Sequence, residues 1–214
     1  MAVQKVFKRY EYKYLLTREQ KELLQNVMEE YMIPDEYGKS TICNLYFDTP
    51  QYLLIRRSIE NKVYKEKVRL RTYGRAEPAG EAFIELKKKY KKVVYKRRIC
   101  TEYEKAIQYL CRGERVVGES QIGEELDYAL RLYQGIRPAM WLSYEREAFY
   151  GKEDHELRMT FDQNILWRTE DLDLSSPIYG RSLLDEDQSL LEIKVGHAIP
   201  LWLSLIHISE PTRH

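Results

Sequence analysis

Charged and apolar residues alternate along much of this chain with the two-residue period of a β-strand. In the clearest segment, Lys67, Arg69 and Arg71 fall on one face, and Val68 and Leu70 fall on the other. Side chains at positions i and i+2 of a strand share a face. We therefore expect strands that have one basic and one apolar face. The alternation predicts strands over residues 6–16, 40–48, 63–73, 81–89, 93–99, 140–150, 157–165 and 189–195, with 172–174 as a weaker candidate.

Three other segments carry apolar residues at helical spacing. Thr17 is a good N-cap, and Gln20 three residues later completes a capping box, so a helix begins there and ends at Pro34. Residues 102–112 and 119–133 predict two more helices.

The order of these elements indicates the fold class. Residues 74–80 form a predicted hairpin loop, and Thr49 with Pro50 forms a turn. No Pro- or Ser-rich linker divides the chain. The layout predicts an α+β fold with about eight mostly antiparallel strands, for which a closed barrel or a strongly curved sheet fits best; we expect the closed barrel. Because the strands carry charge on one face, we expect a polar interior, with helices packed outside.

Composition narrows the class of protein. The 214 residues include three cysteines without CxxC spacing and four scattered histidines, so neither a disulfide framework nor a histidine-based metal site is expected. A carboxylate-based metal site stays open. The N-terminus lacks an apolar signal segment, and the longest apolar run, residues 199–206, is far shorter than the ~20 residues that span a bilayer. We expect a cytoplasmic protein without a transmembrane segment.

Charge is unevenly distributed although the net charge is only +1. Residues 56–98 contain 16 Lys or Arg against 5 Asp or Glu, whereas residues 153–192 contain 3 basic and 11 acidic residues. Such asymmetry can focus a field on one region. Two oppositely charged, solvated faces would give the same counts.

The polar strand residues also occur in short motifs. These are Tyr-Glu-Tyr-Lys-Tyr at 10–14, Tyr-Phe-Asp-Thr at 46–49, Lys-Val-Arg-Leu-Arg-Thr-Tyr-Gly at 67–74, Phe-Ile-Glu-Leu-Lys at 83–87, Tyr-Glu-Arg-Glu-Ala-Phe at 144–149, Leu-Arg-Met-Thr-Phe-Asp at 157–162 and Leu-Glu-Ile-Lys-Val at 191–195. In this order they resemble the catalytic domain of the vacuolar transporter chaperone (VTC) family of polyphosphate polymerases, within the triphosphate tunnel metalloenzymes. The resemblance runs from Phe7 to Trp202.

The resemblance implies a tunnel of eight antiparallel strands that holds ATP and polyphosphate, with Mn²⁺ or Mg²⁺ bound by carboxylates. Arginine forks and lysine point charges suit phosphate, and these metals favour oxygen ligands. Carried over by motif, the catalytic residues are Arg69, Arg71, Lys87, Arg146 and Arg158; the phosphate-binding residues are Lys13, Lys67, Lys96, Arg98 and Lys194; the metal ligands are Glu192, with Glu11 and Asp162 as helpers.

Two acidic residues in the motifs favour a structural interpretation. Glu85 fits an ordinary same-face ion pair with Lys87. Asp48 precedes a turn and fits a capping role.

Several functions remain open at this stage. In a polymerase, the terminal phosphate of a growing chain attacks the γ-phosphate of ATP, whereas in a tripolyphosphatase or nucleoside triphosphatase water attacks instead. A non-catalytic polyphosphate or inositol-phosphate binding module would show the same basic strands. The lysines of residues 88–92 could mimic a nucleic-acid patch, but no recognition helix accompanies them, so nucleic acid is not an expected partner. The sequence identifies no protein or membrane partner.

The C-terminal residues depart from the family pattern. Residues 1–203 are predicted to form the VTC-like domain, and residues 204–214 resemble a translated cloning or adapter tail, which we exclude from the predicted fold. The family would continue with a terminal helix bearing another basic residue.

Overall fold

The computed structural model of this chain describes residues 10–61, 63–91, 93–114, 120–196 and 198–204. The strands are β1 (Tyr10–Thr17), β2 (Met32–Asp48), β3 (Tyr64–Tyr73), β4 (Glu81–Tyr90), β5 (Val93–Glu102), β6 (Arg137–Gly151), β7 (Arg158–Arg168), β8 (Arg181–Ser182) and β9 (Gln188–Val195). The helices are α1 (Arg18–Tyr31), α2 (Leu53–Glu60), α3 (Tyr103–Ile107), the π-helical η1 (Gln108–Arg112), α4 (Gln121–Leu132) and α5 (Leu201–Ser204). Residues 205–214, most of the predicted tail, lie outside the described part.

The strands form one sheet in the order β1-β9-β7-β6-β2-β3-β4-β5, with β8 paired to β7. The pairings of β9 with β1 and β7, and of β3 with β2 and β4, are antiparallel, as is that of β4 with β5. The α+β class is therefore confirmed. The strand order begins at β1 and ends at β5, so the predicted closed barrel is not confirmed.

The chain divides into two compact units. Unit 1 consists of Met1–Ser40, Tyr144–Ile165 and Ser182–His214, and unit 2 consists of Thr41–Ser143 and Leu166–Arg181. Each unit has its own apolar core, so we describe each by itself.

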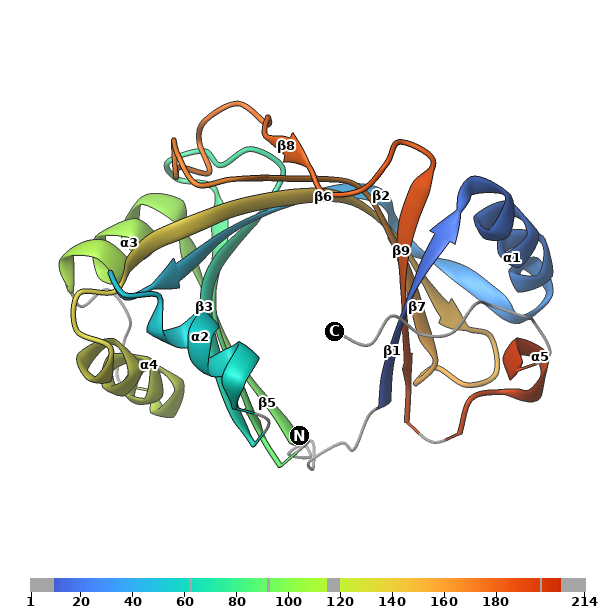
Figure 1. Ribbon diagram of the computed structural model, residues 1–214, viewed down its shortest axis with the longest axis horizontal. Helices are drawn as coiled ribbons and strands as arrows, with labels where there is room; N and C mark the ends of the chain where they lie inside the picture. The colour runs from blue at the N-terminus through green and yellow to red at the C-terminus, as the bar shows by residue number, and fades with distance from the viewer. Residues whose placement is uncertain (1–9, 62, 92, 115–119, 197, 205–214) are drawn as a thin grey trace. The chain divides into compact units, whose positions relative to one another are not determined.

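The core of unit 1 lies between α1 and its strands (Figure 1). Thr17 caps α1 by accepting a hydrogen bond from the Gln20 amide, and the Gln20 side chain accepts one from the Thr17 amide, which confirms the predicted capping box. Leu24 and Met28 of α1 are buried with the apolar face of β7 and β9. Buried residues of this cluster include Leu16, Met159, Phe161, Leu191 and Ile193.

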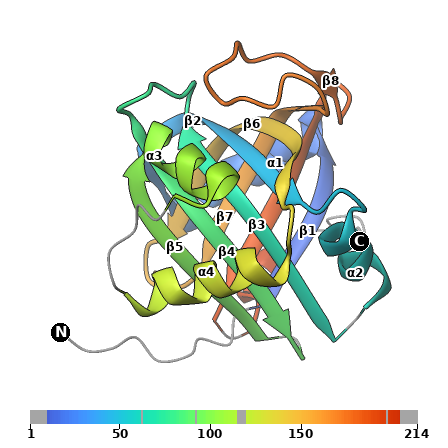
Figure 2. The same cartoon turned by 90° about the vertical axis from the view of Figure 1, so that its left-hand side faces the viewer.

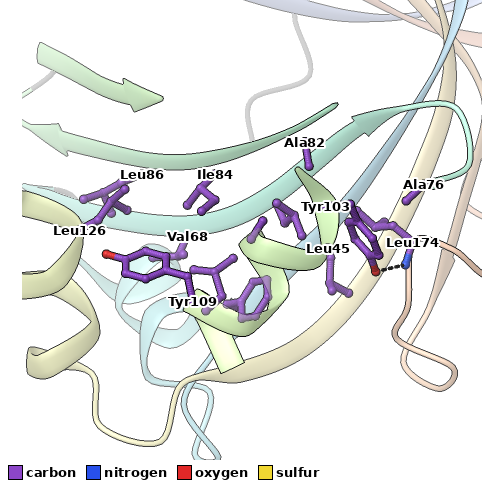
Figure 3. Packing of buried hydrophobic residues seen from close by; sticks show 14 of the residues in the cluster. Leu45, Val68, Ala76, Ala82, Ile84, Leu86, Tyr103, Tyr109, Leu126 and Leu174 are labelled. Atoms are coloured by element: carbon purple, nitrogen blue, oxygen red, sulfur yellow. Dashed lines mark hydrogen bonds between the residues drawn. The ribbon is translucent and has the colours of Figure 1, made fainter. Parts of the chain in front are cut away.

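In unit 2, α3 and α4 lie over one face of β3, β4 and β5 (Figure 2). The strands supply Val68, Ile84 and Leu86, and the helices supply Tyr109 and Leu126, all of which are buried (Figure 3). Because apolar side chains alternate along each strand, burial of this face directs the intervening charged residues to the opposite face.

The structure corrects several predicted boundaries. β2 begins at Met32, directly after α1, rather than at residue 40. Residues 172–174 form no strand. The sequence did not predict the helix α2, because the residue at its N-cap position, Tyr52, is not a capping residue. Tyr52 has a left-handed backbone conformation, with φ 57°. Asp48 instead accepts hydrogen bonds from the amides of Leu54 and Ile55, each at 2.9 Å, which confirms its structural role.

Candidate phosphate-binding site

The basic face of unit 2 is the polar side of β3, β4 and β5. It comprises the carboxylate of Glu85 and the cations of Lys67, Arg69, Arg71, Lys87, Lys96 and Arg98. These residues lie on one face because register partners and alternate positions in an antiparallel sheet share a side. The structure therefore brings together six of the ten basic site residues predicted from the sequence.

Glu85 lies at the centre of this face. The register places it between Arg69 on β3 and Arg98 on β5. Arg69 Nε donates to Glu85 Oε2 at 2.6 Å, Lys96 Nζ lies 2.6 Å from Glu85 Oε1, and Arg98 Nε lies 3.6 Å from the same oxygen. The side chain of Glu85 is only 1% exposed. The sequence predicted an ion pair of Glu85 with Lys87, whereas the structure shows a buried carboxylate that Arg69, Lys96 and Arg98 share.

The charges of the basic face shift the pKa values of its members. Burial alone would raise the pKa of Glu85, but Arg69, Arg71 and Lys96 outweigh it and lower the pKa to about 2. Burial lowers the pKa of Lys96, with a further contribution from the two arginines, although Glu85 opposes the shift. Glu85 is therefore ionised at neutral pH and neutralises only part of the surrounding positive charge.

Three lysines lie in a row across the sheet beside this carboxylate. Lys67 on β3 is the register partner of Lys87 on β4, and Lys87 is the partner of Lys96 on β5. Adjacent strands lie about 4.8 Å apart. Like charges directly opposite one another destabilise a sheet unless an anion accompanies them. The row adds to the positive charge of the basic face, and Glu85 accompanies it through its pair with Lys96.

β2 and β4 add uncharged residues that the sequence analysis missed. Asn44 Oδ1 accepts a hydrogen bond from Arg71 Nε at 3.0 Å, and the Tyr46 hydroxyl accepts one from Arg69 at 3.3 Å. Burial would raise the pKa of Tyr46, but Arg69 and its basic neighbours lower it overall. The Arg98 guanidinium stacks 3.6 Å from the centre of the Phe83 ring. These contacts fix the arginine planes, which favours two-point binding of phosphate oxygens.

The mixed face of unit 1 is the polar side of β1, β9, β7 and part of β6. It comprises Glu11, Lys13, Arg146, Arg158, Thr160, Asp162, Glu192 and Lys194. The register pairs Lys13 with Glu192 and Glu11 with Lys194. The remaining four predicted basic residues and all three predicted carboxylates thus lie in unit 1.

Glu192, a predicted metal ligand, is a largely enclosed carboxylate with two lysines beside it. Lys194 Nζ donates to Glu192 Oε2 at 2.9 Å, and Lys13 Nζ lies 3.6 Å from Oε1. Burial raises the pKa of Glu192, but Lys194, Lys13 and Arg146 lower it to about 2. The carboxylate is anionic at neutral pH and 11% exposed.

Asp162 is held differently. Arg146 binds it through two hydrogen bonds, Nε to Oδ1 at 2.6 Å and the terminal nitrogen to Oδ2 at 2.7 Å. Burial lowers the pKa of Arg146, but the Asp162 hydrogen bond and charge raise it overall. Such a fork engages both carboxylate oxygens. Both oxygens of Asp162 therefore orient Arg146, which favours a positioning role over a role as a metal ligand.

The described residues contain no group of three or more His, Cys, Asp or Glu side chains arranged to hold a metal ion. Mg²⁺ and Mn²⁺ can be held by one or two carboxylates together with substrate oxygens and water. Glu192, ionised and accessible, fits that requirement. Glu11 is the register partner of Lys194, so it lies one row of the sheet away from Glu192.

Comparison with known proteins identifies the family. The model of the VTC domain matches residues 8–212. The chain belongs to the VTC domain family. This match confirms the resemblance noted in the sequence motifs.

Solved structures related to this VTC domain show the same fold. A Bacillus halodurans protein described as a candidate adenylate cyclase has a TM-score of 0.54 at 16% identity, covering 86% of this chain and 78% of that one. A Hippeastrum protein, described as a candidate adenylyl cyclase with a dominant triphosphatase activity, has a TM-score of 0.51 at 14% identity, covering 88% and 80%. A search of curated proteins found no significant match. Among the described residues, no helix combines the length and apolar character needed to cross a membrane.

Proposed function

We propose that this VTC domain is a metal-dependent polyphosphate polymerase, which transfers the γ-phosphate of ATP to the end of a growing polyphosphate chain. The observation that carries the proposal is the lysine row of the basic face, in a chain of the VTC domain family. Repeated cations along neighbouring strands suit repeated phosphates along a chain. Proteins that read duplex nucleic acid commonly place a recognition helix in the major groove, and the basic face presents strands instead.

The chemistry requires little covalent help from the protein. An oxygen of the terminal phosphate forms a bond to the γ-phosphorus of ATP, the bond from that phosphorus to the β–γ bridging oxygen breaks, and ADP leaves with that oxygen. Catalysis then depends on positioning and on neutralising charge. Arg69, Arg71 and Arg98 present oriented guanidinium groups, and Lys67 and Lys87 supply further positive charge.

The mixed face of unit 1 carries carboxylates as well as cations. Arg146 is oriented by its two bonds to Asp162, so its plane is set before a phosphate arrives. Glu192, with Glu11 as a helper, is the residue that would hold Mn²⁺ or Mg²⁺, which when bound neutralises phosphate charge. Lys13, Lys194 and Arg158 would bind phosphate oxygens on the same face.

A triphosphatase is the second candidate. The Hippeastrum structure with the same fold is described by its dominant triphosphatase activity. The same residues would serve, with water in place of the terminal phosphate as the attacking group.

The test is incubation of the purified protein with ATP and Mn²⁺, followed by gel analysis of polyphosphate, with ADP and free phosphate measured in parallel. A ladder of chains with ADP supports the polymerase. Free phosphate without chains overturns the polymerase and supports the triphosphatase. Neither product, in a protein that still binds polyphosphate, points to a binding module and overturns both enzymes.

A further inference from the structure

Two buried hydroxyl groups of unit 1 lack a hydrogen-bond partner among the described residues. They are Thr160 Oγ1 on β7 and Ser189 Oγ on β9. Burying a hydroxyl without a partner is unfavourable, because water no longer satisfies it. Native structures keep few such groups, and each calls for an explanation.

The two hydroxyls lie on opposite faces of the sheet. Thr160 is the register partner of Glu192, and it lies between Arg158 and Asp162, so its side chain belongs to the mixed face. Ser189 is the register partner of Leu16, which is buried in the apolar core. One hydroxyl therefore lies among ions, and the other lies toward the core.

The neighbours of Thr160 are engaged with other groups. Glu192 accepts a hydrogen bond from the Lys194 ammonium, and Asp162 accepts two from the Arg146 guanidinium. A valine would fill the same strand position with nearly the same shape, because both residues are β-branched. The hydroxyl is thus the feature of Thr160 that the local packing does not explain.

We infer that the charged side chains beside Thr160 turn toward a bound phosphate group, and that the uncovered Thr160 hydroxyl then donates a hydrogen bond to a phosphate oxygen of the substrate, which makes Thr160 a phosphate-binding residue of the mixed face. The inference rests on the proposed function. An anionic acceptor fits this position because Lys13 lies in the same row of the sheet as Thr160, and Lys194 and Arg158 lie in the next row. A hydroxyl can rotate toward such an acceptor and satisfy its own donor at the same time.

Thr160 and Ser189 both have a buried hydroxyl without a partner among the described residues, so they provide a matched test. The variants are Thr160→Val, which removes only the hydroxyl, Thr160→Ser, which keeps it, and Ser189→Ala, which removes the other buried hydroxyl. Tripolyphosphate binding is measured by calorimetry without divalent metal, and thermal unfolding is measured with and without tripolyphosphate.

We expect Thr160→Val to weaken tripolyphosphate binding about tenfold, the loss of one hydrogen bond to a charged group. Thr160→Ser should stay within about threefold of wild type, and Ser189→Ala should bind as wild type does. Without ligand, Thr160→Val and Ser189→Ala should unfold at or above the wild-type temperature, because each loses a buried unsatisfied group. Only Thr160→Val should lose part of the stabilisation by ligand.

The inference is overturned if Thr160→Val binds tripolyphosphate as wild type does, while the proposed function then stands. Equal weakening by Thr160→Val and Ser189→Ala would also overturn it, since it would indicate a general effect on unit 1. If wild type itself fails to bind tripolyphosphate, both the inference and the proposed function fail. Thr160→Ala replaces Thr160→Val, with the same expected loss, if the valine variant does not fold.

Discussion

The two polar faces balance their charges in different ways. The basic face of unit 2 surrounds one carboxylate, that of Glu85, with arginines and lysines from three strands. The mixed face of unit 1 places cations beside its carboxylates, as in the pairs of Glu192 with Lys13 and of Asp162 with Arg146. The basic face therefore has excess positive charge, whereas the charges of the mixed face largely compensate one another.

Two carboxylates with similarly lowered pKa values, one on each face, differ in exposure. Glu85 and Glu192 both have a pKa of about 2. Glu85 is 1% exposed and has three cations beside it, whereas Glu192 is 11% exposed. A depressed pKa therefore does not by itself identify a metal ligand. The accessible edge of Glu192 makes it the better candidate, and Glu85 serves as an internal counterion of the basic face.

The largest expected effect is on turnover, and it should come from the mixed face. Glu192→Gln should reduce ATP turnover by about 1,000-fold, about 4 kcal/mol, because the anionic metal ligand is lost. Tripolyphosphate binding without metal should fall little. The measurement is ADP release with Mn²⁺, together with calorimetry.

Glu145→Gln is the matched control for this variant. Glu145 also lies in unit 1 and pairs with Lys39, and Asn164 donates to it. The same charge change there should leave turnover within about threefold of wild type. Normal turnover by Glu192→Gln would remove Glu192 from the metal-binding role.

The next effect is on stability, and it should come from the basic face. Glu85→Gln leaves Arg69, Lys96 and Arg98 without their shared counterion, so the free energy of unfolding should fall by about 3 kcal/mol. Urea unfolding monitored by fluorescence measures this change. Tripolyphosphate should stabilise Glu85→Gln more than wild type, because it replaces the missing anion. Equal ligand stabilisation of both proteins would contradict the counterion role.

Acid should remove the same stabilisation in wild type. The pKa of Glu85 is about 2 in the folded protein against an ordinary 4.5, so the unfolded chain binds more protons between these values. The contribution of Glu85 is complete above about pH 4.5, and about 2 kcal/mol of it should be lost by pH 3. The difference in unfolding free energy between wild type and Glu85→Gln should therefore shrink by that amount. A pH-independent difference would show that the substitution acts through packing instead of charge.

Much of the fold and of both faces could be predicted from the sequence, because strand alternation is a local signal. Lys67, Arg69 and Arg71 lie on one face as the two-residue period predicted. The helix α2 was not predicted, since its cap comes from Asp48, several residues earlier and outside the usual capping positions.

The importance of Glu85 and Thr160 depends on pairings between strands that are distant in sequence. Spacing within one strand places Glu85 on the basic face, but only the register shows that arginines flank it on both sides. Thr160 lay inside a recognised motif, yet its unsatisfied hydroxyl and its position opposite Glu192 require the β7–β9 register. Closure of the sheet was inferred from the number and antiparallel layout of the strands and from the family resemblance, and none of these determines whether the two end strands pair.

The smallest expected effect tests the lysine row. Lys87→Gln should weaken tripolyphosphate binding about tenfold, about 1.4 kcal/mol, and should reduce the salt dependence of binding by nearly one counterion. Without ligand it should slightly raise the melting temperature, because Lys87 lies opposite the like charges of Lys67 and Lys96. Lys105→Gln is the control, since Lys105 lies on α3 and pairs with Glu102. Weaker binding together with a higher melting temperature, in Lys87→Gln alone, would show that the row lowers stability in order to bind phosphate. Equal behaviour of the two variants would show that the lysine row has no role in binding beyond that of any surface charge.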